Sequence, residues 1–166
     1  GAESPAFTAA TSKQAGGTAA KPELVSVSDT TATVKAVSGV EFSIDGGSTW
    51  QTSGTFSGLI SNTAYEIIAR CAETATSFAG SASAPLSVRT DRSQVSAPSK
   101  PVLVSMKDKT VTLQAVEGME YSVDGGGTWL KSPVITVYTY GTKQFICRWA
   151  QTDRTYASPA SDWLIV

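Results

Sequence analysis

The sequence predicts an all-β protein built from two tandem β-sandwich domains, and three observations support this prediction. A segment of about 79 residues occurs twice, which is the size of a small domain. Within each copy, apolar and polar residues alternate with a period of two, as they do in half-buried strands. Turn-forming residues separate these short runs, a pattern typical of sandwiches.

The repeat is visible residue by residue. The first copy begins at Lys21-Pro22 and the second at Lys100-Pro101. Their first halves share the segments Leu24-Val25-Ser26, Asp45-Gly46-Gly47 and Thr49-Trp50, which recur as Leu103-Val104-Ser105, Asp124-Gly125-Gly126 and Thr128-Trp129. After a one-residue slip the later halves align too, with Arg70 opposite Arg148. A period this long is typical of whole domains rather than of solenoid units.

The composition of the segments before and between the copies sets the predicted domain boundaries. Residues 1–20 are mostly Ala, Thr, Ser and Gly, which predicts a flexible N-terminal tether. Residues 21–90 form the first domain and residues 100–166 the second. Residues 91–99, rich in Ser and Pro, are the predicted linker.

The alternation identifies the residues of the core. Phe42 and Ile44 alternate with polar neighbours, and Tyr65, Ile67 and Ala69 alternate with Glu66, Ile68 and Arg70. We expect about seven strands in each copy and no helix, because Gly, Thr and Val are too frequent for stable helices.

Composition excludes several function classes. The formal net charge is -1, which leaves no basic surface for nucleic acid. Histidine is absent, and with it the commonest general base and metal ligand. The cysteines Cys71 and Cys147 fall in different copies, so we expect both to be buried free thiols. No apolar run approaches the ~20 residues of a membrane-spanning helix. We therefore predict no catalytic residues, no metal and no cofactor.

One motif points to a family. Leu59 is followed at two-residue spacing by Ser61, Thr63 and Tyr65. This resembles the tyrosine corner of fibronectin type III domains, in which the Tyr hydroxyl bonds an upstream backbone group. Ser61 stands where that family usually has Pro, the second copy lacks the Tyr, and Ala36 and Ala115 stand near the place of the family's strand-B Trp. An atypical immunoglobulin-type sandwich therefore remains the alternative.

A second motif, Ser-x-Asp-x-Gly-x-Thr-Trp, begins at Ser43 and again at Ser122. It resembles the Asp-box hairpin of sialidase propellers, which also occurs in unrelated β folds. In that hairpin the Asp side chain caps turn amides and Gly supplies a positive φ. The chain is too short for a propeller and lacks an arginine cluster for sialic acid, so the motif is predicted to be structural.

The aromatic residues divide into two groups. We expect Trp50 and Trp129 to pack inward over their hairpins, and Arg70 and Arg148 to point outward, each within reach of a cross-strand glutamate. Tyr138, Tyr140 and Trp163 have no aromatic counterparts in the first copy and are the candidate binding residues. The residues assigned structural roles are Asp45, Gly47, Trp50, Leu59, Tyr65, Asp124, Gly126 and Trp129.

The two motifs together resemble repeats of bacterial surface proteins. That resemblance implies a non-catalytic, extracellular spacer or adhesion module of a secreted or cell-surface protein. Its partner would be a protein or glycan at the cell surface, or a neighbouring domain of the same polypeptide. The alternative is a carbohydrate-binding module accessory to a glycan-active enzyme. A calcium site at the acidic turns would be a further possibility, with no ligand pattern to support it.

Overall fold

The computed structural model describes residues 11–139 and 141–166, and over these residues it contains strands, turns and loops but no helix. The chain divides into two compact units, one ending at Asp91 and one running from Arg92 to Val166. Each unit holds two three-stranded antiparallel sheets. The predicted all-β class and the tandem sandwich architecture are therefore confirmed.

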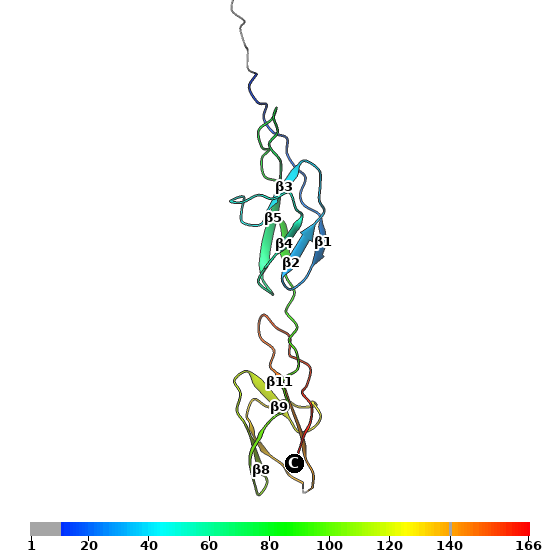
Figure 1. Cartoon of the computed structure of the whole chain (residues 1–166), viewed down its shortest axis with the longest axis vertical. Helices are drawn as coiled ribbons and strands as arrows, with labels where there is room; N and C mark the ends of the chain where they lie inside the picture. The colour runs from blue at the N-terminus through cyan, green and yellow to red at the C-terminus, as the bar shows by residue number, and fades with distance from the viewer. Residues whose placement is uncertain (1–10, 140) are drawn as a thin grey trace, which may run out of the picture. The chain divides into compact units, whose positions relative to one another are not determined.

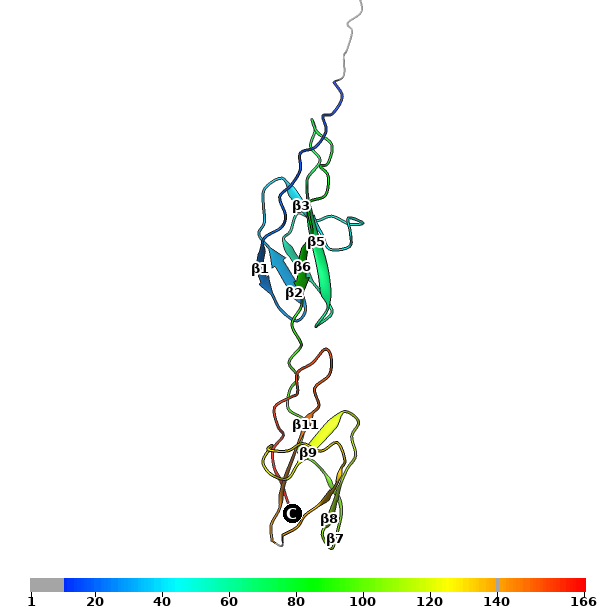
Figure 2. The same cartoon turned by 180° about the vertical axis from the view of Figure 1, so that it is seen from behind.

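The first unit contains six strands (Figures 1 and 2). One sheet has the order β1-β2-β4 and the other the order β3-β5-β6, which is the split between sheets seen in immunoglobulin-like and fibronectin type III-like sandwiches. The strands are β1 (Leu24–Val27), β2 (Thr31–Val34), β3 (Val40–Ser43), β4 (Thr55–Ser57), β5 (Ala64–Cys71) and β6 (Leu86–Arg89).

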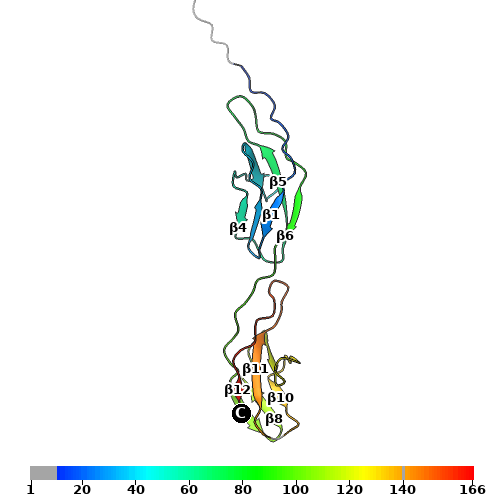
Figure 3. The same ribbon diagram turned by 90° about the vertical axis from the view of Figure 1, so that its right-hand side faces the viewer.

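The second unit repeats this topology, with sheets ordered β10-β8-β7 and β12-β11-β9; Figure 3 shows β11 beside β12. Each unit has six strands among the described residues instead of the expected seven, because the residues after each Asp hairpin contribute only single bridges, Phe42–Gln51 and Tyr121–Leu130. The strands are β7 (Leu103–Lys107), β8 (Thr110–Leu113), β9 (Met119–Ser122), β10 (Val134–Thr136), β11 (Gln144–Trp149) and β12 (Leu164–Ile165).

The core of each unit lies between its two sheets. In the first unit, Phe42 and Ile67 from one sheet and Val34 from the other are almost fully buried. In the second unit, Phe145 and Leu113 are buried in the same way. Burying one such side chain stabilises the fold by roughly 1.5–3 kcal/mol. Phe42, Ile67 and Ala69 are buried as the alternation predicted, whereas Ile44 and Tyr65 are only partly buried and pack against the core.

The predicted tether is attached where the structure describes it. Gln14 pairs in parallel with Ser77, and Lys13 forms an ion pair with Glu73. Ala19 is buried in the core of the first unit. In Figures 1 to 3 this blue segment runs along the loop that follows β5. Residues 11–20, which we call the first strap, are therefore part of the first unit; residues 1–10 lie outside the described residues.

The predicted linker shows the same arrangement in the second unit. Ser93 pairs in parallel with Thr155, and the Arg92 guanidinium donates to the carbonyl of Asp153. The Cys147 thiol donates to the carbonyl of Ser99. Residues 92–99 thus form a second strap on their own unit instead of a free connection. Composition suggested otherwise because Ser and Pro are common in linkers, but the backbone groups of Ser93 and the carbonyl of Ser99 are hydrogen-bonded here.

The first strap depends on close backbone contact at a glycine. A Cβ at Gly16 would lie 2.3 Å from the Phe78 carbonyl oxygen, whereas one at Gly17 would meet only the Cys71 sulfur at 3.7 Å. We therefore expect Gly16→Ala to detach the strap and to destabilise the first unit by about 1–3 kcal/mol. The matched variant Gly17→Ala should change stability by less than about 0.5 kcal/mol.

Hydrogen exchange measures this difference directly. The Phe78 amide donates to the Gln14 carbonyl, so Gly16→Ala should remove its protection and Gly17→Ala should keep it. Equal protection in the two variants would contradict a tightly packed strap.

Candidate functional sites

The Asp hairpin of each unit is a closed hydrogen-bond network. In the first, the Asp45 carboxylate accepts from the Thr49 amide at 2.9 Å and from the Thr49 hydroxyl at 2.6 Å. The Ser43 hydroxyl donates to Asp45 at 2.7 Å and accepts from the Gly47 amide at 2.9 Å. These bonds tie the two sides of the turn together, which gives the Asp a structural role.

The hairpin of the second unit has nearly the same geometry. Asp124 accepts from the amide and hydroxyl of Thr128 at 2.9 and 2.6 Å, and Ser122 donates to it at 2.7 Å. Gly126 has a φ of 92°, a left-handed conformation that favours glycine. The turn chemistry expected from the motif is therefore present in both copies.

These donors change the acidity of the two aspartates. The hydroxyl and amide of Thr49, with Ser43, lower the pKa of Asp45 to about 2, because their hydrogen bonds stabilise the ionised form. The corresponding donors Thr128 and Ser122 lower the pKa of Asp124 further. Both carboxylates are therefore ionised at neutral pH, and their lone pairs are engaged by the turn.

A stack of three side chains lies against each hairpin. The Arg70 guanidinium lies over the Trp50 ring, 4.2 Å from its centroid. The same guanidinium donates to Glu41 through two nitrogens, at 2.9 and 2.8 Å. Both nitrogens contact the same carboxylate oxygen, Oε2, so the arrangement combines an ion pair with a cation–π contact. The predicted pairing of Arg70 with a cross-strand glutamate is confirmed.

The second unit repeats the stack and corrects the predicted place of both tryptophans. Arg148 lies 4.1 Å from the Trp129 ring centroid and donates to Glu120 at 3.0 and 2.9 Å. Trp50 and Trp129 do not pack into the core as expected. Each is half-buried over its own turn glycine, because the outward arginine supplies a partner on the outer face of the sheet. The Asp-hairpin motif by itself did not predict this stack. The sequence signal for it was that Glu, Trp and Arg recur at matching positions in the two copies.

The tyrosine corner has its expected contacts in the first unit. The Tyr65 hydroxyl accepts from the Ile60 amide at 2.9 Å, and Leu59 packs against the core. The Thr90 hydroxyl donates to the Ile60 carbonyl at 2.6 Å, which fastens β6 to the same corner. These contacts place Leu59 and Tyr65 in the scaffold.

The second unit uses a different tyrosine for a comparable purpose. The buried Tyr121 hydroxyl donates to the Gln114 carbonyl at 2.7 Å and accepts from the Val116 amide at 3.1 Å. It therefore holds the loop between β8 and β9. Phe42 occupies the equivalent place in the first unit. The replacement of Phe by Tyr between the aligned copies was the sequence signal for this hydroxyl contact, and sequence reasoning missed it.

The candidate binding aromatics lie on separate segments of the second unit. Tyr138, in the β10–β11 loop, is 82% exposed, and Trp163, just before β12, is 43% exposed. A Cβ at Gly125 would lie 3.6 Å from the Trp163 ring, so this indole borders the Asp124 hairpin. Tyr140 lies outside the described residues.

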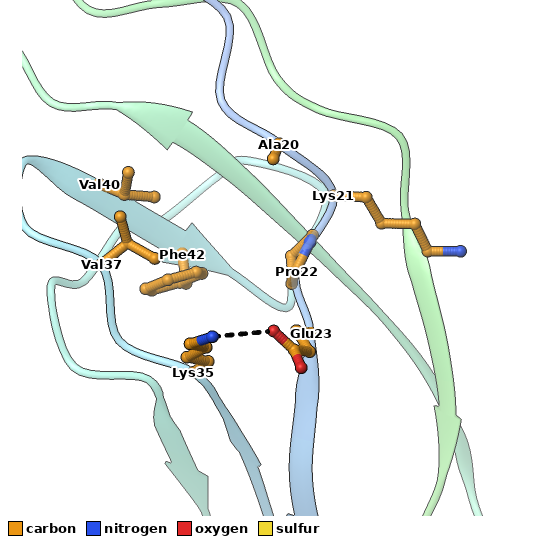
Figure 4. Close-up of a pocket in the computed structure, with 8 residues that line it drawn as sticks. All are labelled: Ala20, Lys21, Pro22, Glu23, Lys35, Val37, Val40 and Phe42. Atoms are coloured by element: carbon orange, nitrogen blue, oxygen red, sulfur yellow. Dashed lines mark hydrogen bonds and ion pairs between the residues drawn. The ribbon is translucent and has the colours of Figure 1, made fainter.

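Each unit has an open apolar groove at an equivalent place, which the sequence reasoning did not predict. The first has a volume of about 190 Å³, with Phe42 and Val40 on one side and Pro22 on the other (Figure 4). Its edge carries an ion pair between Glu23 and Lys35, 3.3 Å apart.

The groove of the second unit is larger, about 290 Å³. Val102 and Gln114 take the places of Glu23 and Lys35, and the Trp149 side chain also lines it. The recurring Lys-Pro pair at the start of each repeat borders both grooves.

The cysteines and acids form no chemical centre among the described residues. Both thiols are free; Cys147 is buried as expected, and burial raises its pKa. Cys71 is only half-buried, which corrects the prediction for that residue. Over residues 11–139 and 141–166, no group of three or more His, Cys, Asp or Glu is placed to hold a metal. The same residues include no helix with the length and apolar character needed to cross a bilayer.

The chain was compared with protein families, curated proteins and solved structures. No known protein family matches the chain, and no curated protein matches it. Solved structures do match, among them the crystal structure of chicken CNTN1 FN1-FN3 domains, which is 15% identical with a TM-score of 0.34 over 88% of this chain. The match covers 64% of that structure's length. At this similarity the match carries no argument, and the sandwich assignment rests on the strand order described above.

The low pKa values of the hairpin aspartates predict how stability depends on pH. The folded pKa of Asp45 lies below the unfolded value of 3.8, so its ionised form stabilises the fold. This contribution is present above about pH 4 and is lost as the pH falls toward about 2. Asp45→Asn and Asp124→Asn should therefore lower the melting temperature at pH 7 and have much less effect near pH 2.

The control for these variants is Glu66→Gln, which removes an exposed carboxylate from β5 without touching a hairpin. Thermal unfolding followed by circular dichroism at several pH values gives the comparison. A melting temperature at pH 7 that is the same for Asp45→Asn and Glu66→Gln would show that the hairpin carboxylate does not stabilise the fold.

Proposed function

We propose that this chain is a non-catalytic spacer and protein-interaction module of a bacterial extracellular protein, in which two β-sandwich domains follow one another in series. The observation that carries the proposal is the duplicated strap. Gln14 pairs with Ser77 in the first unit, and Ser93 pairs with Thr155 in the second. Each unit therefore incorporates the segment that leads into it.

A strap of this kind suits a mechanical role. Pulling on the chain would load parallel backbone pairing and, in the first unit, the ion pair between Lys13 and Glu73 before it reached the core. Arg92 lies 5.9 Å from the Tyr156 ring centroid, and Lys13 lies 5.8 Å from that of Phe78, so both straps have a cation–π contact in the same place. The same backbone pairing and cation–π contact occur in both copies, which supports a structural role for the polar groups of the straps.

Force spectroscopy of the full chain between two handles tests the spacer role. We expect two separate unfolding events, each releasing about 75–80 residues, or roughly 270 Å of chain at ~3.6 Å per residue. The Gly16→Ala variant should lower the force of one event and leave the other unchanged, with Gly17→Ala as its control. A single event that released the whole chain would contradict two independent units in series.

Carbohydrate binding is the second candidate, and the exposure of Tyr138 and Trp163 favours it. Aromatic rings at a surface bury apolar area against the faces of sugar rings while they keep their polar atoms in water.

Affinity electrophoresis in gels containing plant, mucin or peptidoglycan glycans tests this candidate. If the chain binds glycans, its migration should be retarded. Trp163→Ala or Tyr138→Ala should abolish most of this retardation, while the thermal unfolding of the variant stays the same as that of the unaltered chain. Leu130→Ala, which truncates an exposed apolar side chain of the same unit, is the control. Unretarded migration in every glycan would leave the spacer role alone.

A further inference from the structure

Two equivalent strands form exposed edges of the molecule. β1 is the outer strand of the sheet β1-β2-β4, and β7 is the outer strand of the sheet β10-β8-β7. Within the part of the chain that the structure describes, β1 pairs only with β2, and β7 pairs only with β8. Each strand therefore presents one side of its backbone without a neighbouring strand, which is a template for pairing with another chain.

Both edges also expose apolar side chains. Val25 in β1 is 63% exposed and Val104 in β7 is 62% exposed, and Met106 in β7 is 51% exposed. All five residues of β7 are exposed, and its one charged residue is the last, Lys107. Natural proteins usually place charge along such edges or cover them, so two exposed edge strands with apolar middles mark an interaction surface.

An irregularity limits which part of each edge can accept a partner. The register shifts between Leu24 and Ser26 in β1 and between Leu103 and Ser105 in β7. Beyond these shifts the pairing is regular, from Ser26 onward in β1 and from Ser105 onward in β7. The regular second halves are therefore the parts suited to added pairing.

The charges beside the two edges are opposite in sign. Beside β1 lie the acidic residues Glu23 and Asp29 and one lysine, Lys21, so the acids are in excess. Lysines lie at both ends of β7, at Lys100, Lys107 and Lys109, with Asp108 as the one acid among them. In the antiparallel direction, Glu23 at the start of β1 would therefore meet Lys107 at the end of β7.

The whole units carry the same difference. Residues 11–91 contain five Lys and Arg against seven Asp and Glu, and residues 92–166 contain eight against six. Pairing β1 with β1, or β7 with β7, would bring like charges together, whereas pairing β1 with β7 brings opposite charges together. Both side chains of the ion pair between Glu23 and Lys35 are exposed to solvent, so the Glu23 carboxylate stays accessible to a partner strand.

We propose that copies of this chain associate edge to edge, with β1 of one copy pairing with β7 of a second copy. The backbone groups of the two edges supply the hydrogen bonds, Met106 adds apolar contact, and Glu23 and Lys107 select the partner edge. Because the two paired surfaces differ, the assembly keeps one unused β1 edge and one unused β7 edge after each copy is added. This self-association is independent of the spacer and glycan-binding roles.

A charge exchange tests the proposal on the full chain. Sedimentation velocity over a series of protein concentrations should show the average mass of the unaltered chain rising with concentration, and rising less in ~1 M salt, where the screening length falls to about 3 Å. Glu23→Lys and Lys107→Glu should each shift association to a several-fold higher concentration. An equimolar mixture of the two variants should recover association, because each edge then finds a partner edge of opposite charge on the other variant.

The controls apply the same changes of charge elsewhere. Glu66→Lys on β5 and Lys131→Glu outside β7 should associate like the unaltered chain, and circular dichroism checks that every variant is folded. The proposal is overturned if the unaltered chain stays monomeric throughout the concentration series. It is equally overturned if Glu23→Lys alone associates normally, which would indicate β7–β7 pairing, or if the mixture does not recover association.

Discussion

The constraint on which this structure depends is the small size of each hydrophobic core. A unit of about 80 residues buries a smaller share of its surface than a large domain does. In the first unit, three of the eight buried core residues are alanines, at positions 19, 32 and 69. Few large side chains are therefore available to hold two sheets together, and the loops need other means of attachment.

Polar side chains supply that attachment. Asp45 and Asp124 close the hairpins, Tyr65 and Thr90 fasten the corner, and the Arg70 stack covers the outer face of a sheet. Each net hydrogen bond contributes only about 1 kcal/mol, but a domain with small net stability needs several of them. The residues that looked most chemically active in the sequence are thus the ones that the scaffold uses.

The sequence predicted the core better than the surface. Phe42 and Ile67 were identified because strand periodicity records which face of a sheet is buried. Trp50 was assigned to the interior because the Trp of an Asp-box hairpin normally packs inward, whereas its actual partner, Arg70, lies 20 residues further along the chain. The straps were taken for tether and linker, since a single backbone pairing such as that of Gln14 with Ser77 has no periodicity to reveal it.

By itself, the sequence determined the all-β class, the duplication, the two hairpins and the alternating core, because each of these depends on local spacing within a short segment. Tertiary structure alone decided the straps, the grooves beside Pro22 and Pro101, and the exposure of the edge strands β1 and β7. These features arise where segments distant in the chain meet or fail to meet. Which neighbour a strand lacks depends on the order of strands in its sheet, and that order follows from the packing of the whole domain.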